Sequence, residues 1–89
     1  MAGFVGMDPA AVRSLAGQLN AKADEIRTIA ANLSSTLDGT QWVGNDATNF
    51  RSDWNSSHRT QLMHVADALS EASTRATSNA EQQEQASNV

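Results

Sequence analysis

Two histidines and three carboxylates are the side chains with the most capacity for chemistry. His58 and His64 stand six residues apart, so they do not share a helix face as ligands four residues apart would. No cysteine or third histidine supports them as a metal site. Asp53, Asp67 and Glu71 fall in a helical pattern without a cleft, which favours a solvated surface over acid–base catalysis. We therefore predict no enzyme, no catalytic residue, no metal and no cofactor.

Composition excludes several other classes of function. The chain has 89 residues, a net charge of −4, only six Lys or Arg and no cysteine. An acidic chain with so few cations is a poor partner for nucleic acid or for an anionic membrane surface. No apolar run is long enough to span a bilayer, and "MAGFVGM" lacks the features of a cleaved signal peptide. Any export must therefore use another kind of signal.

The first half of the chain has the pattern of one amphipathic helix over about 9–38. Asp8 can be its N-cap, and Pro9 then occupies the first helical position. Gly39 is the expected C-cap. One column of large apolar residues and a second column of smaller ones recur every seven residues: Val12, Leu19, Ile26, Leu33, and Ala16, Ala23, Ala30, Leu37. Leu15 and Ile29 begin a third column, which Lys22 and Thr36 interrupt.

A second amphipathic helix is predicted over about 46–80, capped by Asn45 or Asp46. Its apolar positions follow steps of three and four: Ala47, Phe50, Trp54, His58, Leu62, Val65, Leu69, Ala72, Ala76 and Ala80. A polar face with Arg51 and other charged residues lies opposite. The polar end, about 81–89, is expected to be flexible because no apolar residue anchors it.

A short connection over about 39–45 makes the two helices antiparallel neighbours. The prediction is an all-α chain, 1–89, that forms a single helical-hairpin domain. One hairpin leaves much of each apolar face in water, so we expect two hairpins to pair into a four-helix bundle. The residues expected in this core and dimer interface are Val12, Leu15, Leu19, Ile26, Leu33, Phe50, Trp54, Leu62, Val65 and Leu69.

The connection itself contains Trp42, Val43 and Gly44. Trp42 either covers the helix ends or faces a partner, and Gly44 would allow a close approach. A Trp-x-Gly between two amphipathic helices, in a cysteine-free chain of this length, resembles the WXG family of small type VII (ESX) secretion proteins, which are ESAT/CFP-like. The resemblance covers nearly the whole chain, including Phe50 and Trp54.

The resemblance implies a helical hairpin that forms a homodimer, or a heterodimer with another WXG-type protein, in the cytoplasm. It implies recognition through Trp42-Val43-Gly44 and secretion by a type VII ATPase. In the family, the export signal includes a Tyr-x-x-x-Asp/Glu just after the second helix of one subunit, whereas this chain has no tyrosine. Either a partner subunit supplies that signal or this subgroup uses another one.

Two further interpretations stay open on the residues alone. The chain could be an intracellular adaptor or chaperone that binds helical segments of a larger exported toxin. It could also act on membranes as an amphipathic helix, although its acidic and mixed polar faces do not favour a membrane.

Overall fold

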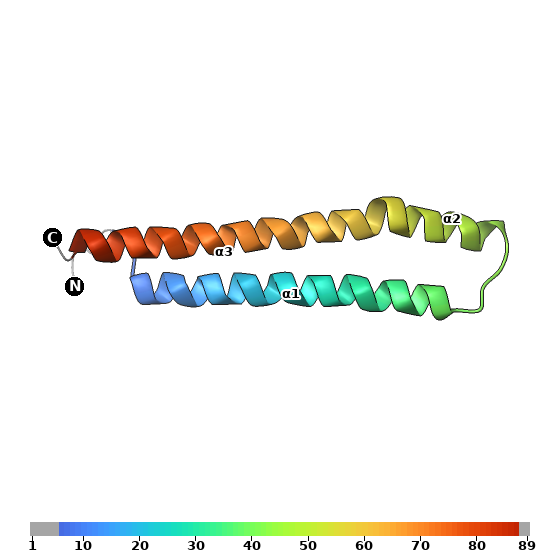
Figure 1. The fold of residues 1–89 in the computed structure, drawn as a ribbon, viewed down its shortest axis with the longest axis horizontal. Helices are drawn as coiled ribbons and strands as arrows, with labels where there is room; N and C mark the ends of the chain where they lie inside the picture. Colours follow the sequence, from blue (N-terminus) through green and yellow to red (C-terminus); the bar gives the residue numbers. More distant parts are fainter. Residues whose placement is uncertain (1–5, 88–89) are drawn as a thin grey trace.

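A computed structural model describes residues 6–87, which form two helical arms lying side by side (Figure 1). The first arm is α1, Pro9–Gly39. The second arm is built from α2, Asn45–Asp53, a π-helical turn η1, Trp54–His58, and α3, Arg59–Ser87. The arms run antiparallel and meet at one turn, so the predicted all-α hairpin is confirmed. Within residues 6–87, no helix combines the length and apolar character needed to cross a membrane.

Helix α1 begins where its capping residues predict. The Oδ1 atom of Asp8 accepts hydrogen bonds from the backbone N–H groups of Ala10, at 3.1 Å, and Ala11, at 3.4 Å. Pro9 follows at the first helical position, where a missing N–H leaves no bond unmade. The carboxylate also satisfies two of the backbone donors that every helix start leaves free.

The end of α1 differs from the expectation for Gly39. The helix includes Gly39 and is capped by Thr40 in an extended conformation. The Thr40 hydroxyl donates to the Thr36 carbonyl at 2.6 Å, and its backbone N–H donates to the Leu37 carbonyl at 3.3 Å. A hydrogen-bonding side chain thus ends the helix in place of a left-handed glycine.

The second arm also begins differently from the expectation for Asn45 or Asp46. Gly44 is the N-cap, and the cap makes no side-chain hydrogen bond among the residues described. The Gly44 carbonyl accepts from the Thr48 backbone N–H at 3.0 Å and from the Thr48 hydroxyl at 3.1 Å. Asp46 lies in the first turn, where its charge favours the positive end of the helix.

The second arm extends further than the predicted helix, which was expected to end at about residue 80 and to be followed by a flexible segment. Helix α3 continues to Ser87, and the last two residues lie outside the described chain. Ala80, at residue 80 itself, is fully buried. One turn further on, the Glu84 carboxylate accepts from Arg13 Nε at 2.9 Å. This long-range ion pair links two polar residues, so no apolar pattern could have indicated it.

Small residues line the contact between the arms. Ala16, Ala23 and Ala30 of α1 are buried, as are Ala47, Trp54, Ala66 and Ala80 of the second arm. Between Ala66 and Ala80, the Ser73 hydroxyl donates to the Ala16 carbonyl of α1 at 2.7 Å. A hydroxyl reaching a helix backbone in this way requires that the two helices approach closely, which the alanine column permits.

The π-helical turn η1 keeps the buried residues of the second arm on one face. Trp54 and Ala66 are both buried, although twelve residues separate them. At 3.6 residues per turn, twelve residues would place them about 120° apart, whereas eleven would place them about 20° apart. The π-helical turn absorbs one extra residue and so restores the alignment.

Candidate functional site: the turn and the apolar edge

The end of the hairpin presents the Trp42-Val43-Gly44 segment to solvent. The Trp42 ring packs against the Phe50 ring of α2, with centroids 5.5 Å apart and planes tilted by 55°. Trp42 remains 38% exposed, Phe50 is about half exposed, and Val43 is 92% exposed. Trp42 therefore covers part of α2, and together with Val43 it leaves an apolar surface exposed to solvent.

Gly44 has a backbone conformation that side chains disfavour. Its φ is +129° and its ψ is 179°, a region that is nearly reserved for glycine. A Cβ at this position would meet no atom within 4 Å in the chain. The conformation, and no crowding within the hairpin, is therefore what requires glycine between Val43 and α2.

Arg51 makes hydrogen bonds to the backbone of the turn. The sequence pattern did not reveal this role. Its guanidinium donates to the carbonyls of Trp42 at 2.8 Å, Thr40 at 2.9 Å and Leu37 at 3.3 Å. These carbonyls lie at or just past the C-terminal end of α1, where a helix has no internal donors left and attracts cations. We expected Arg51 on the solvated face, and the only hint against that was its closeness in sequence to the turn.

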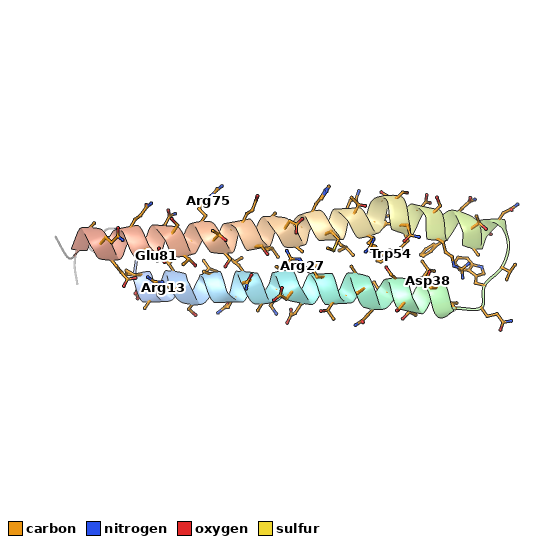
Figure 2. The ribbon with its side chains drawn as sticks, in the orientation of Figure 1. Arg13, Arg27, Asp38, Trp54, Arg75 and Glu81 are labelled. Carbon is orange, nitrogen blue, oxygen red and sulfur yellow. The ribbon has the colours of Figure 1, made fainter. Side chains whose placement is uncertain are left out.

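Trp54 is the large side chain of the hairpin's own interior. It is 9% exposed and lies between the arms (Figure 2). Its indole N–H donates to the Ser34 hydroxyl of α1 at 2.8 Å, which satisfies the polar atom of the ring. The two tryptophans therefore differ in role. Trp54 stabilises the interior of the hairpin, whereas Trp42 is exposed at its surface.

Arg27 marks one long edge of the hairpin as polar. It extends from α1 to donate to Asp67 at 3.0 Å and to Ser70 at 3.1 Å, both on α3 (Figure 2). On each helix the residues one and four places after a buried alanine lie on the same side of it. Arg27 follows Ala23 by four, while Asp67 and Ser70 follow Ala66 by one and four. These sides meet at one edge.

The opposite long edge is mostly apolar, although Lys22, one place before Ala23, also lies on it. Residues one place before, or three places after, a buried small residue lie on the other side of each helix. On α1 these positions include Leu15, Ile29 and Leu33, each about half exposed. Val65, the corresponding residue on α3 before Ala66, is also half exposed. Because the polar sides share one edge, these apolar side chains share the other.

The structure divides the expected core residues into three groups. Trp54 is buried within the hairpin; Val12, Leu19, Ile26, Leu62 and Leu69 are half-buried; and Leu15, Leu33, Phe50 and Val65 are exposed. Ile29 was absent from the expected core residues but belongs with the exposed ones. The sequence could have indicated this position of Ile29, because Ile29 precedes Ala30 just as Leu15 precedes Ala16.

The hairpin exposes more surface than a compact chain of its mass. Its accessible surface is 6417 Å², whereas a compact monomer of 9.5 kDa exposes about 5,000 Å². Its radius of gyration is 19.9 Å, compared with about 12 Å for a compact domain of this length. The surplus of about 1,400 Å² exceeds the roughly 800 Å² that each partner contributes to a standard interface.

The side chains that were considered for chemistry, namely His58, His64, Asp53, Asp67 and Glu71, are all exposed at the surface of the hairpin. Residues 6–87 contain no group of three or more His, Asp or Glu side chains placed to hold a metal ion. The charged residue Arg75 points away from α1 (Figure 2). A scan against models of known protein families, a search of curated proteins and a search of solved structures each found no match.

Proposed function

We propose that this chain is a WXG-type protein of a type VII (ESX) secretion system, recognised through Trp42-Val43-Gly44 and secreted as a dimer. The observation that carries the proposal is a turn that is fixed and exposed at once. Arg51 binds the carbonyls of Thr40 and Trp42 and one carbonyl at the end of α1, while Trp42 and Val43 are exposed. A surface held in one conformation loses little entropy when a partner binds it.

The apolar edge supports the dimer. Leu15, Ile29, Leu33 and Val65 remain half exposed along one side of the hairpin. A second hairpin laid on this edge would complete a four-helix bundle and remove these side chains from water. Each fully buried Leu or Ile contributes about 1.5–3 kcal/mol, so several together provide a driving force for association.

The export signal is the part of the proposal that departs from the WXG pattern. The chain has no tyrosine, so a Tyr-x-x-x-Asp/Glu signal would have to come from another subunit. Otherwise the signal lies in the Gln-rich segment near the end of α3. Deletion of residues 77–89 in a chain that is exported alone would test the second possibility.

Export of Trp42→Ala from a type VII-competent host tests the recognition role of the turn. The variant is expressed with and without a second small Trp-x-Gly protein, and the supernatant is assayed alongside dimer content and unfolding of the purified protein. We expect a folded dimer that is no longer exported, because the Trp42 ring lies outside the contact between the arms. Gln41→Ala, an exposed change in the same turn, is the matched control and should be exported normally.

Export that falls only as far as stability falls would show that Trp42 is merely a structural cap. Retention of both the wild type and Trp42→Ala inside a competent host would favour the intracellular adaptor, whose apolar edge would then bind a helix of its client.

A further inference from the structure

The surface at the turn combines exposed apolar side chains with carboxylates that form no ion pair. We infer that the partner that binds this surface is a protein with an apolar pocket rimmed by lysine or arginine side chains. The inference rests on the proposed function, because it names the chemistry of the partner that recognises Trp42-Val43-Gly44. The residues of this turn surface are Trp42, Val43 and Phe50, with Asp38, Asp46 and Asp53 beside them.

The apolar part of the turn surface lies at one end of the hairpin. Val43 is almost fully exposed, and it belongs to the connection between α1 and α2 (Figure 1). The rings of Trp42 and Phe50 remain partly exposed although they pack on each other. Side chains at the end of a narrow rod are removed from water only by a hollow surface that surrounds them. The partner must therefore contribute a pocket.

Two carboxylates flank the Phe50 ring along α2. Asp46 precedes Phe50 by four residues and Asp53 follows it by three, and these spacings place side chains on one face of a helix. All three residues are exposed. Within residues 6–87, neither carboxylate forms an ion pair. The exposed ring therefore lies between two negative charges that the hairpin itself does not neutralise.

Asp38 adds a third carboxylate, in a position that the helix disfavours. It lies in the last turn of α1, next to the connection (Figure 2). The C-terminal end of a helix is the negative end of its dipole, so an acidic residue is unfavourable there. That turn contains no basic residue, and Asp38 forms no ion pair within the described part of the chain. A charge that its own helix disfavours is consistent with a role toward a partner.

Cations do not offset the charge at the turn as they do along the arms. Arg13, Lys22 and Arg27 each pair with a carboxylate along the arms. No lysine or arginine occurs between Arg27 and Arg51 in the sequence. The Arg51 guanidinium is half-buried and donates to three backbone carbonyls. Residues 38–53 contain three aspartates and this one arginine, which leaves a net charge of −2.

A cationic rim is the complement of this surface. Lysine or arginine side chains around a pocket would pair with the three carboxylates while the pocket covers Trp42 and Val43. Complementary charge speeds docking, and like charge rejects wrong partners. An acidic protein segment and an anionic membrane would both be repelled, so the charge at the turn selects a cationic protein surface.

The variant Asp38→Lys separates recognition from stability, because the two should change in opposite directions. Lysine at the C-terminal end of α1 is favoured by the helix dipole, so the purified variant should melt at a higher temperature than the wild type. The same change places a cation against the cationic rim. Export from a type VII-competent host should therefore fall by about tenfold or more. A variant that lost export by losing structure would instead melt at a lower temperature.

Two further variants, measured under the conditions in which the wild type is exported, complete the test. Glu81→Lys is the matched control, because it makes the same change of charge at an exposed residue near the opposite end of the hairpin (Figure 2). It should be exported normally. The double variant Asp46→Asn/Asp53→Asn removes two carboxylates without adding a cation. Its export should fall by a smaller factor than that of Asp38→Lys, because attraction is lost but no repulsion is added.

Each outcome decides the inference. Normal export of Asp38→Lys or of the double variant, alongside retention of Trp42→Ala, would overturn the cationic partner and leave the proposed function intact. An equal loss of export in Glu81→Lys would show that the total charge of the chain matters, and it would also overturn the inference. Retention of the wild type, or normal export of Trp42→Ala, would contradict the proposed function itself and this inference with it.

Discussion

The half of the hairpin near the turn and the half near the termini are stabilised in different ways. Near the turn, a buried Trp54 bonds Ser34, Trp42 packs on Phe50, and Arg51 binds three carbonyls. Near the termini, buried alanines dominate, with the Ser73 bond to the Ala16 carbonyl and the Arg13–Glu84 ion pair joining the helices.

The difference indicates what each half contributes. Alanines allow the helices to approach closely but bury little apolar area, so the terminal half gains less from apolar burial than the turn half. The turn half contains the large rings and an oriented cation. It can therefore hold an exposed tryptophan in a fixed place, as the proposed recognition surface requires.

The largest expected effect concerns the π-helical turn that joins the halves. One alanine inserted between Asn55 and Ser56 would rotate α3 by about 100° and turn Ala66 and Ala80 away from α1. We expect loss of cooperative unfolding by circular dichroism. Deletion of Ser56 should be tolerated, because it removes the extra residue that η1 absorbs and restores a regular α-helix in the same alignment. Equal damage from both changes would contradict this account of η1.

Trp54→Ala should have the next largest effect, a loss of about 3–5 kcal/mol in the free energy of unfolding. It removes the largest buried ring and leaves the Ser34 hydroxyl without its donor. Trp42→Ala is the matched control and should cost less, because its ring is 38% exposed. Urea unfolding at one protein concentration compares the two. A larger loss for Trp42 would reverse the roles assigned to the two rings.

Gly44→Ala should destabilise the chain by about 1–3 kcal/mol, because φ is +129° at Gly44. Gly39→Ala is the control in the same region. Gly39 is helical and has open space around it, so alanine should stabilise the helix by about 0.5–1 kcal/mol. Thermal melting of both variants shows whether the two shifts have opposite signs, and a neutral Gly44→Ala would count against a conformationally fixed turn.

Replacing Arg51 or Arg13 should lower the free energy of unfolding by smaller amounts, and the two losses should differ. Arg51→Met should cost about 1–2 kcal/mol, since it leaves three carbonyls without their charged donor. Arg13→Met should cost less than about 1 kcal/mol, because its ion pair with Glu84 is exposed to solvent. Hydrogen exchange locates the effects. The first variant should loosen residues near Thr40, and the second should loosen the end of α3. Equal losses of unfolding free energy in the two variants would contradict the claim that the two halves are stabilised in different ways.

The sequence predicted the helices and their pairing because helix periodicity, the Asp8-Pro9 start and a short polar connection are local signals. The interior of the hairpin was harder to predict. Three successive steps of four, from Phe50 through Trp54 and His58 to Leu62, drift around a regular helix, and that drift was the available sign of the π-helical turn.

Other features depend on contacts between distant segments. Arg51 resembles any surface arginine until the end of α1 is placed beside it. The Arg13–Glu84 pair joins residues 71 apart in sequence. Gly44 was noted as a place for close approach, whereas the structure assigns its value to backbone conformation. Such roles depend on the tertiary arrangement, and local sequence patterns carry no information about it.

Sedimentation equilibrium of the wild type, Ile29→Asp and Ala31→Asp is the most direct test of the claim that the apolar edge is an interface. Ile29 lies on that edge and Ala31 is exposed on the polar side of the same helix. We predict twice the chain mass for the wild type and for Ala31→Asp. For Ile29→Asp we predict the mass of one chain that is still helical, because a charge at this half-exposed site is costly only once a partner covers it. A dimer unaffected by Ile29→Asp, or a wild type that stays monomeric at micromolar concentration even when a second small Trp-x-Gly protein is present, would contradict the account.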